Sequence, residues 1–125
     1  MIELVDTHCH LADEVFDGDR EAVLERAREA GVTRILAVGG GGPIQASEKS
    51  AELAAADSML RATAGIHPHD ALSYDDAIEA RIEALLVRPE VVAVGETGLD
   101  YYYDNSPRDA QRRALARHLA LAERH

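Results

Sequence analysis

Strand-like and helix-like segments alternate strictly along this chain of 125 residues, and the alternation restricts its possible folds more than any other feature. Short apolar runs indicate the strands, and apolar residues that recur every three or four positions indicate the helices. The sequence predicts strands at 2–5, 32–38, 60–66 and 91–94, and helices at 20–30, from 43 to about 56, from 73 and from 106. No linker, low-complexity tract or repeat interrupts the series, so we expect one domain over residues 1–125.

Capping residues support several of the predicted helix ends. Asp19 is placed to cap the first helix, and Gly31 is placed to stop it. Ser73 with Asp76 resembles a capping box for the third helix, and Ser106 is expected to open the fourth. The predicted buried stripe of the fourth helix includes Leu115, Leu119 and Ala122.

Strict alternation with short connections predicts parallel strands joined by right-handed crossovers, which places the chain in the α/β class. The expected architecture is a (β/α)8 barrel of the TIM type. Only its first four βα units fit into this length, because a complete barrel needs about 200 residues or more. We therefore expect a half-barrel, with a fifth strand beginning after residue 125. An open doubly wound sheet is the alternative, since alternation alone does not separate the two architectures.

Charge and composition narrow the function and the compartment. The net charge of −10 argues against broad affinity for nucleic acid, which requires clustered lysine and arginine. Residues 106–125 carry five arginines against two carboxylates, and we favour a solvated helix face there over a phosphate site. The single cysteine, Cys9, cannot form an internal disulfide, and no apolar run reaches the roughly 18 residues of a membrane span. We expect a cytoplasmic protein with no membrane partner.

Residues with metal-ligand chemistry gather where the predicted strands end. His8 and His10 follow the first strand, His67 and His69 follow the third, and Glu96 follows the fourth. The carboxyl ends of parallel strands lie on one side of a sheet, which is where barrels and open sheets place their sites. The sequence therefore predicts that these five side chains converge on one rim.

The spacing of His8 and His10 suits a shared cation. In an extended chain, residues two apart point to the same side, so both imidazoles reach one ion while Cys9 faces away. Imidazole favours zinc and its transition-metal neighbours, and a carboxylate such as Glu96 can complete or bridge the site. Cys9 itself is interpreted as a small buried residue, because no neighbouring group is placed to activate it.

Three other features have weaker interpretations. The glycines at 39–42 are not a phosphate loop, because no G-K-[ST] follows at the required spacing, and we expect a flexible rim loop beside the site. The tyrosines at 101–103 lie just beyond Glu96, and packing of the loop and a stacking platform for a base or sugar are equally open. No function is assigned to His118 or His125.

Three stretches closely resemble the signatures of the TatD-type deoxyribonuclease family. They are VDTHCHL at 5–11, GIHPHDA at 65–71 and GETGLDYYYDNSPRDAQ at 95–111. The resemblance runs through the whole chain in order and spacing. It implies a barrel similar to other amidohydrolase-type enzymes, with one or two divalent metal ions (Zn, Mg or Mn) per complete site. It also implies a hydrolase that cleaves phosphodiester bonds, with DNA or another phosphodiester as substrate.

The resemblance also implies roles for single residues. His8 and His10 are then ligands of a first metal ion, and Glu96 is a ligand shared between two. His67 lines the pocket without an assigned ligand role. Asp100 and Arg108 fall in the same signatures, behind the ligands or beside the substrate. Further ligands and the general base are expected beyond residue 125, so no catalytic base is named.

Two alternatives to a nuclease are considered. One is another H-x-H hydrolase, such as a histidinol-phosphatase-type phosphoesterase or a cyclic amidase, which the GETGLDYY stretch disfavours. The other is a catalytically silent half-barrel that binds metal weakly or self-associates through its open edges. Arg108 likewise has a structural alternative, in which it pairs with a carboxylate such as Asp104 and only holds the loop.

Overall fold

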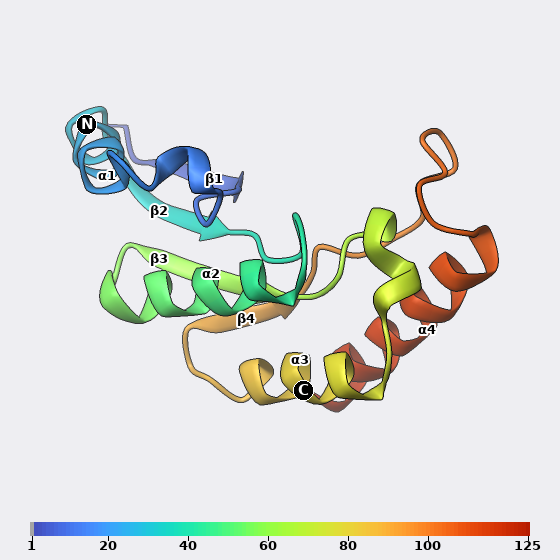
Figure 1. The fold of residues 1–125 in the computed structure, drawn as a ribbon. Coiled ribbons are helices and arrows are strands. Elements are labelled where there is room, and N and C mark those ends of the chain that lie inside the picture. The colour runs from blue at the N-terminus through green and yellow to red at the C-terminus, as the bar shows by residue number, and fades with distance from the viewer. Residues whose placement is uncertain (1) are drawn as a thin grey trace.

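The computed structural model describes residues 2–125 and shows four strands, each followed by a helix (Figure 1). The strands are β1 (Leu4–Cys9), β2 (Val32–Ala37), β3 (Leu60–Ala64) and β4 (Val91–Val94). The helices are α1 (Arg20–Glu29), α2 (Ile44–Ala56), α3 (Asp76–Leu86) and α4 (Arg108–Arg124). Two short 3-10 helices, Glu14–Phe16 and Pro68–Ser73, lie in the connections after β1 and β3.

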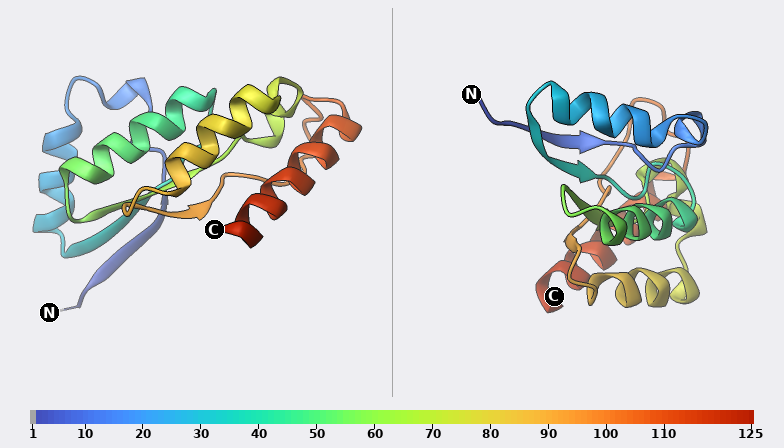
Figure 2. Two further views of the ribbon diagram at one scale, coloured as in Figure 1. Left: turned by 90° about the horizontal axis from the view of Figure 1, so that it is seen from below. Right: turned by 90° about the vertical axis from the view of Figure 1, so that its left-hand side faces the viewer.

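The sheet has the order β1-β2-β3-β4, and every neighbouring pair is parallel. Right-handed crossovers between successive neighbours place every helix on the same face, whereas a doubly wound sheet reverses its strand order and covers both faces. The helices indeed form an outer arc around the strands (Figure 2). The predicted α/β class is therefore confirmed, and the strand order is that of a barrel segment.

The core lies between the sheet and this outer layer of helices. The alternate residues Leu60, Ala62 and Ala64 of β3 belong to this core, and β3 packs closely against α2, whereas Arg61 between them is exposed. Fully buried side chains at its centre include Leu11, Leu60, Ile66, Ile82 and Leu121. Among residues 2–125, no helix is both long enough and apolar enough to cross a membrane.

Several predicted boundaries are wrong, and those of the first strand and the third helix differ most. The first strand runs over Leu4–Cys9 instead of 2–5, because its register is set by pairing with β2 and not by its own apolar residues. The third helix is capped by Asp75, whose carboxylate accepts the N–H of Ile78 at 2.8 Å. Ser73 ends the preceding 3-10 helix instead, where its hydroxyl donates to the carbonyl of Asp70.

The buried stripe predicted for the last helix is also wrong, since Leu119 and Ala122 are exposed. Its buried face consists of Ala110, Gln111, Ala114, His118 and Leu121. Two of these are polar residues that hydrogen-bond across the core, which a pattern of apolar residues cannot reveal. Ser106 does not cap the helix: its buried hydroxyl donates to the carbonyl of His69 at 2.7 Å and accepts the N–H of Leu72.

Candidate metal centre

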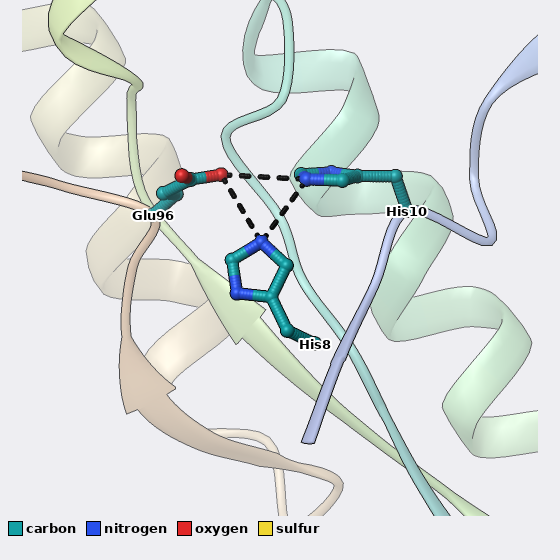
Figure 3. A group of neighbouring side chains, drawn as sticks. All are labelled: His8, His10 and Glu96. Atoms are coloured by element: carbon teal, nitrogen blue, oxygen red, sulfur yellow. Dashed lines mark hydrogen bonds and ion pairs between the residues drawn. The ribbon is translucent and has the colours of Figure 1, made fainter. Parts of the chain in front are cut away.

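His8, His10 and Glu96 point toward one another at the carboxyl ends of β1 and β4 (Figure 3). The two Nε2 atoms of the histidines are 3.2 Å apart. The Oε2 atom of Glu96 lies 3.8 Å from Nε2 of His8 and 3.5 Å from Nε2 of His10. Side chains from the ends of two strands that are distant in sequence thus meet at one point, as the topology predicts.

These distances fit a single ion. Donor atoms about 2.0–2.1 Å from a tetrahedral zinc stand roughly 3.3–3.4 Å from one another, which is close to the separations in this cluster. The donor set of two imidazoles and one carboxylate also suits a transition metal. If these three groups bound a tetrahedral ion, they would leave one coordination position open, as catalytic sites do and closed structural sites do not.

The extended backbone of β1 explains why both imidazoles share one side. His8 and His10 are two residues apart and project together, while Cys9 turns the other way and packs against the hydrophobic core. Burial, and then the charge of Asp6, raise the pKa of the Cys9 thiol. A raised pKa disfavours the thiolate, which supports the interpretation of Cys9 as a packing residue.

The loop at 39–42 contains only glycines, and two of them approach the backbone around Glu96 and His67 closely enough to accept hydrogen bonds from it. The backbone N–H of Glu96 donates to the carbonyl of Gly39 at 2.6 Å, and the N–H of His67 donates to the carbonyl of Gly40. Gly40 has a positive φ of 82°, and a Cβ atom there would lie 2.8 Å from the nitrogen of Glu96. The predicted place of the loop beside the site is confirmed, and close approach explains the need for glycine.

His67 lies against Glu96 but is not a member of the cluster. Its Nδ1 accepts the N–H of His69 at 3.0 Å, so a neutral ring carries its proton on Nε2. Burial lowers the pKa of His67, which favours that neutral form. Nε2 then faces Oε1 of Glu96 at 3.7 Å as a donor and has no lone pair to offer a metal ion. A donor at this position can orient the carboxylate or contact a substrate oxygen.

A cavity of about 320 Å³ opens beside the cluster. It is lined by His10, Asp13, Gly41, His67, His69, Asp70 and Glu96. The cluster therefore borders a space large enough for a small group of a substrate.

A profile of the family described as TatD related DNase matches residues 5–125. The chain belongs to this family. The match confirms the resemblance seen in the sequence and decides against the other H-x-H hydrolases.

Individual TatD relatives show the same similarity. The chain is 42% identical over 120 residues to a protein of Musicola paradisiaca named as the 3'-5' ssDNA/RNA exonuclease TatD, covering 95% of this chain and 45% of that protein. It is 39% identical to the metal-dependent hydrolase YabD of Bacillus subtilis, covering 96% and 46%. The crystal structure of YjjV, a TatD homologue from Escherichia coli, superposes with a TM-score of 0.85 at 35% identity, covering 97% of this chain and 47% of YjjV. The chain thus spans less than half the length of these relatives.

The GETGLDYY stretch of this TatD chain places Asp100 against His69, a pair that the sequence did not single out. Nε2 of His69 lies 2.5 Å from Oδ2 of Asp100. The backbone N–H of Tyr103, and then the His69 ring, lower the pKa of Asp100, so the carboxylate accepts and His69 donates. Both histidines of the GIHPHDA stretch therefore have a fixed place on the rim. The i, i+2 spacing that they share with His8 and His10 is the sequence feature that indicates this place.

Arg108 makes the contact with Asp104 that its structural alternative requires. Its guanidinium donates to both carboxylate oxygens of Asp104, with Nε to Oδ1 at 3.1 Å and Nη2 to Oδ2 at 2.7 Å. The same group lies 4.5 Å from the ring centre of Tyr101. This pairing raises the pKa of Arg108 and ties the side chain to its own loop.

Proposed function

We propose that this chain forms the metal-binding part of a hydrolase that cleaves phosphodiester bonds in single-stranded nucleic acid. One observation carries the proposal: Nε2 of His8, Nε2 of His10 and Oε2 of Glu96 meet at distances suited to one divalent ion. The substrate class is supported by the TatD relatives, which are named as ssDNA/RNA exonucleases. Phosphodiester cleavage in DNA is the reaction that the sequence resemblance implies.

Each residue of the proposed site has a separate task. His8, His10 and Glu96 hold the ion, and the two imidazoles favour zinc over magnesium. A divalent ion in this position supplies Lewis-acid stabilisation of negative charge on phosphoryl oxygens. Nε2 of His67 lies 3.7 Å from Oε1 of Glu96, and a small shift brings it within hydrogen-bond reach of that carboxylate. His69, held by Asp100, lines the same cavity and offers a further polar group to a phosphate.

The ligand assignment is tested by the metal content of purified protein. After removal of metal and dialysis against zinc or manganese, the wild type is expected to retain the ion. His8→Ala, His10→Ala and Glu96→Gln variants are expected to lose most of it, because each removes one of three ligands. The matched control is His125→Ala. This histidine lies at the end of α4, contacts Glu83 of α3 and takes no part in the metal cluster. Equal metal content in the wild type and the His8→Ala/His10→Ala protein contradicts the assignment.

Hydrolysis is tested separately with an end-labelled single-stranded oligonucleotide. Cleavage that requires added metal and disappears in the three ligand variants supports the nuclease. Metal retention without any cleavage by residues 1–125 alone instead supports the catalytically silent half-barrel. The two measurements therefore separate the metal site from the activity.

A further inference from the structure

We propose that the loop between β4 and α4 is a nucleobase-binding subsite, in which Tyr102 and Tyr103 stack on a base of the single-stranded substrate. The inference rests on the proposed function and extends it to substrate binding outside the metal cluster. It is carried by the exposure of these rings, by the hydrogen bonds that hold their loop, and by the edge-to-face contact of Tyr103 with His69, which lines the cavity beside Glu96.

The two tyrosines are unusually exposed for large aromatic side chains. Tyr102 is 88% exposed and Tyr103 is 66% exposed, and their rings meet edge to face at 4.8 Å. The loop that carries them projects from the body of the molecule above α4 (Figure 1). Exposed aromatic rings gathered in one place mark interaction sites, because burying them on a ligand yields a large gain.

Buried hydrogen bonds hold this loop in one conformation. Gln111 is fully buried; its Oε1 accepts the N–H of Asp100 at 2.7 Å, and its Nε2 donates to the carbonyls of Asp100 and Ser106. The carboxylate of Asp100 in turn accepts the N–H groups of Tyr102 and Tyr103 at 3.1 and 3.0 Å. Both ends of the loop are thus fixed to α4, which lowers the entropy lost when a base stacks.

The rings also connect the loop to the cavity. Tyr103 lies edge to face with His69 at 5.6 Å, and His69 lies edge to face with His67 at 4.2 Å. His67 contacts Glu96. A base that rests on Tyr103 therefore lies next to His69, one of the groups that line the cavity beside the metal cluster.

Because the protein is strongly acidic, stacking is a more suitable source of affinity for a nucleic acid strand than charge attraction. With a net charge of −10, the chain cannot attract a polyanion by long-range electrostatics. Stacking on an aromatic ring does not depend on net charge, and it tolerates every base. Arg112 adds one local cation: it is exposed, donates to the hydroxyl of Tyr101 at 3.2 Å, and forms no ion pair among residues 2–125.

The test measures binding without cleavage, in the presence of a chelator. The probes are a short oligothymidylate and an abasic oligonucleotide of the same length. Wild type is expected to bind oligothymidylate more tightly than the abasic strand. Tyr102→Ala is expected to weaken oligothymidylate binding by about 10-fold and leave abasic binding unchanged, whereas Tyr102→Phe keeps wild-type affinity. The matched control is Val87→Ala, an equally exposed apolar residue at the end of α3.

A spectroscopic reading separates stacking from a merely structural effect. The chain contains no tryptophan, so Tyr102→Trp introduces a single reporter. Its fluorescence is expected to be quenched by oligothymidylate and not by the abasic strand. Unchanged affinity in Tyr102→Ala and Tyr103→Ala overturns the subsite, and so do equal losses of affinity for both probes. In either case, metal-dependent cleavage by the wild type leaves the proposed function standing. A wild type that neither binds the strand nor retains a metal ion overturns both.

Discussion

His118 shows at the scale of one residue how a histidine without a predicted role stabilises the rim. It is 1% exposed, its Nε2 accepts the N–H of Ile66 at 3.0 Å, and its Nδ1 donates to the carbonyl of Ala114. Ile66 directly precedes His67, so α4 fixes the end of β3 next to the cavity. His118→Ala is expected to lower the free energy of unfolding by about 2–3 kcal/mol, because it leaves a buried N–H unpaired and a void.

Denaturant unfolding measures this effect. Leu119→Ala, one position along the same helix but exposed, is the control and is expected to change stability by less than about 0.5 kcal/mol. Similar losses in the two variants would show that the hydrogen bond to Ile66 contributes nothing specific.

The same residue gives the fold a pH dependence. Burial lowers the pKa of His118 below its ordinary value of 6.5, although the nearby charge of Glu79 opposes the shift and the Tyr74 ring packs against the imidazole. The unfolded chain therefore binds the proton more readily than the folded one. The stabilisation that the neutral ring provides is complete above pH 6.5 and is lost as the pH falls through the lowered pKa.

Comparison of the wild type with His118→Gln isolates this contribution, since other groups titrate equally in both proteins. The wild type is expected to be the more stable near neutral pH, and its advantage is expected to shrink in mildly acidic buffer. An advantage that stays constant across this range would mean that His118 does not titrate on unfolding.

At the scale of elements, the sequence predicts those helices and strands whose bounds are set by the local pattern of apolar residues. The strand at 91–94 and the helix opened after Asp19 appear at their predicted places, because apolar runs and periodic stripes act locally. The extension of β1 to Cys9 was missed, since Asp6 and His8 are polar and are extended by pairing with β2. The buried face of α4 was missed for a related reason: Gln111 and His118 are buried only because they hydrogen-bond to distant backbone groups.

The rim loop after β2 yields a prediction at this scale. Gly40→Ala forces an L side chain into φ of 82° and places its Cβ 2.8 Å from the nitrogen of Glu96 and 3.1 Å from the carbonyl oxygen of Gly65. The left-handed conformation alone costs about 1–2 kcal/mol, and the clash with rigid backbone adds to it. We expect a lower melting temperature together with weaker metal retention, because the clash displaces Glu96.

Gly42→Ala is the matched control in the same loop. Its Cβ would meet only the Cβ of Ala46 at 3.9 Å, an ordinary contact. Thermal melting and metal analysis of the two variants should therefore separate them clearly. Equal behaviour would indicate that the loop moves freely and does not position Glu96.

At the scale of the whole molecule, topology is what made the candidate site predictable. His8, His10 and Glu96 were expected on one rim because parallel strands end together, and the structure brings them into contact. The bond of His69 to Asp100 and the pairing of Arg108 with Asp104 depend on how the β4–α4 loop folds back. No periodicity encodes that path, so only the neighbourhood of these groups was predictable, and their partners were not.

The two edges of the sheet lead to the last prediction. β1 and β4 each have one neighbour among residues 2–125, and they expose apolar side chains such as Val5 at 59% and Val92 at 55%. More than half of YjjV has no counterpart in this chain, so nothing from that part of the family fold covers these strands here. Unpaired strand edges with apolar side chains template association. A polypeptide of residues 1–125 alone is therefore expected to self-associate.

Sedimentation velocity tests this prediction directly. The wild-type polypeptide is expected to sediment as oligomers or aggregates, and Val5→Lys with Val92→Lys is expected to shift it toward monomer, because a charge on an edge strand opposes pairing with another copy. A lysine in place of the exposed Leu72, which lies outside the sheet, is the control and should leave the distribution unchanged. A wild type that sediments as a compact monomer and melts cooperatively would mean that the exposed edges are stable in water, contrary to the half-barrel interpretation.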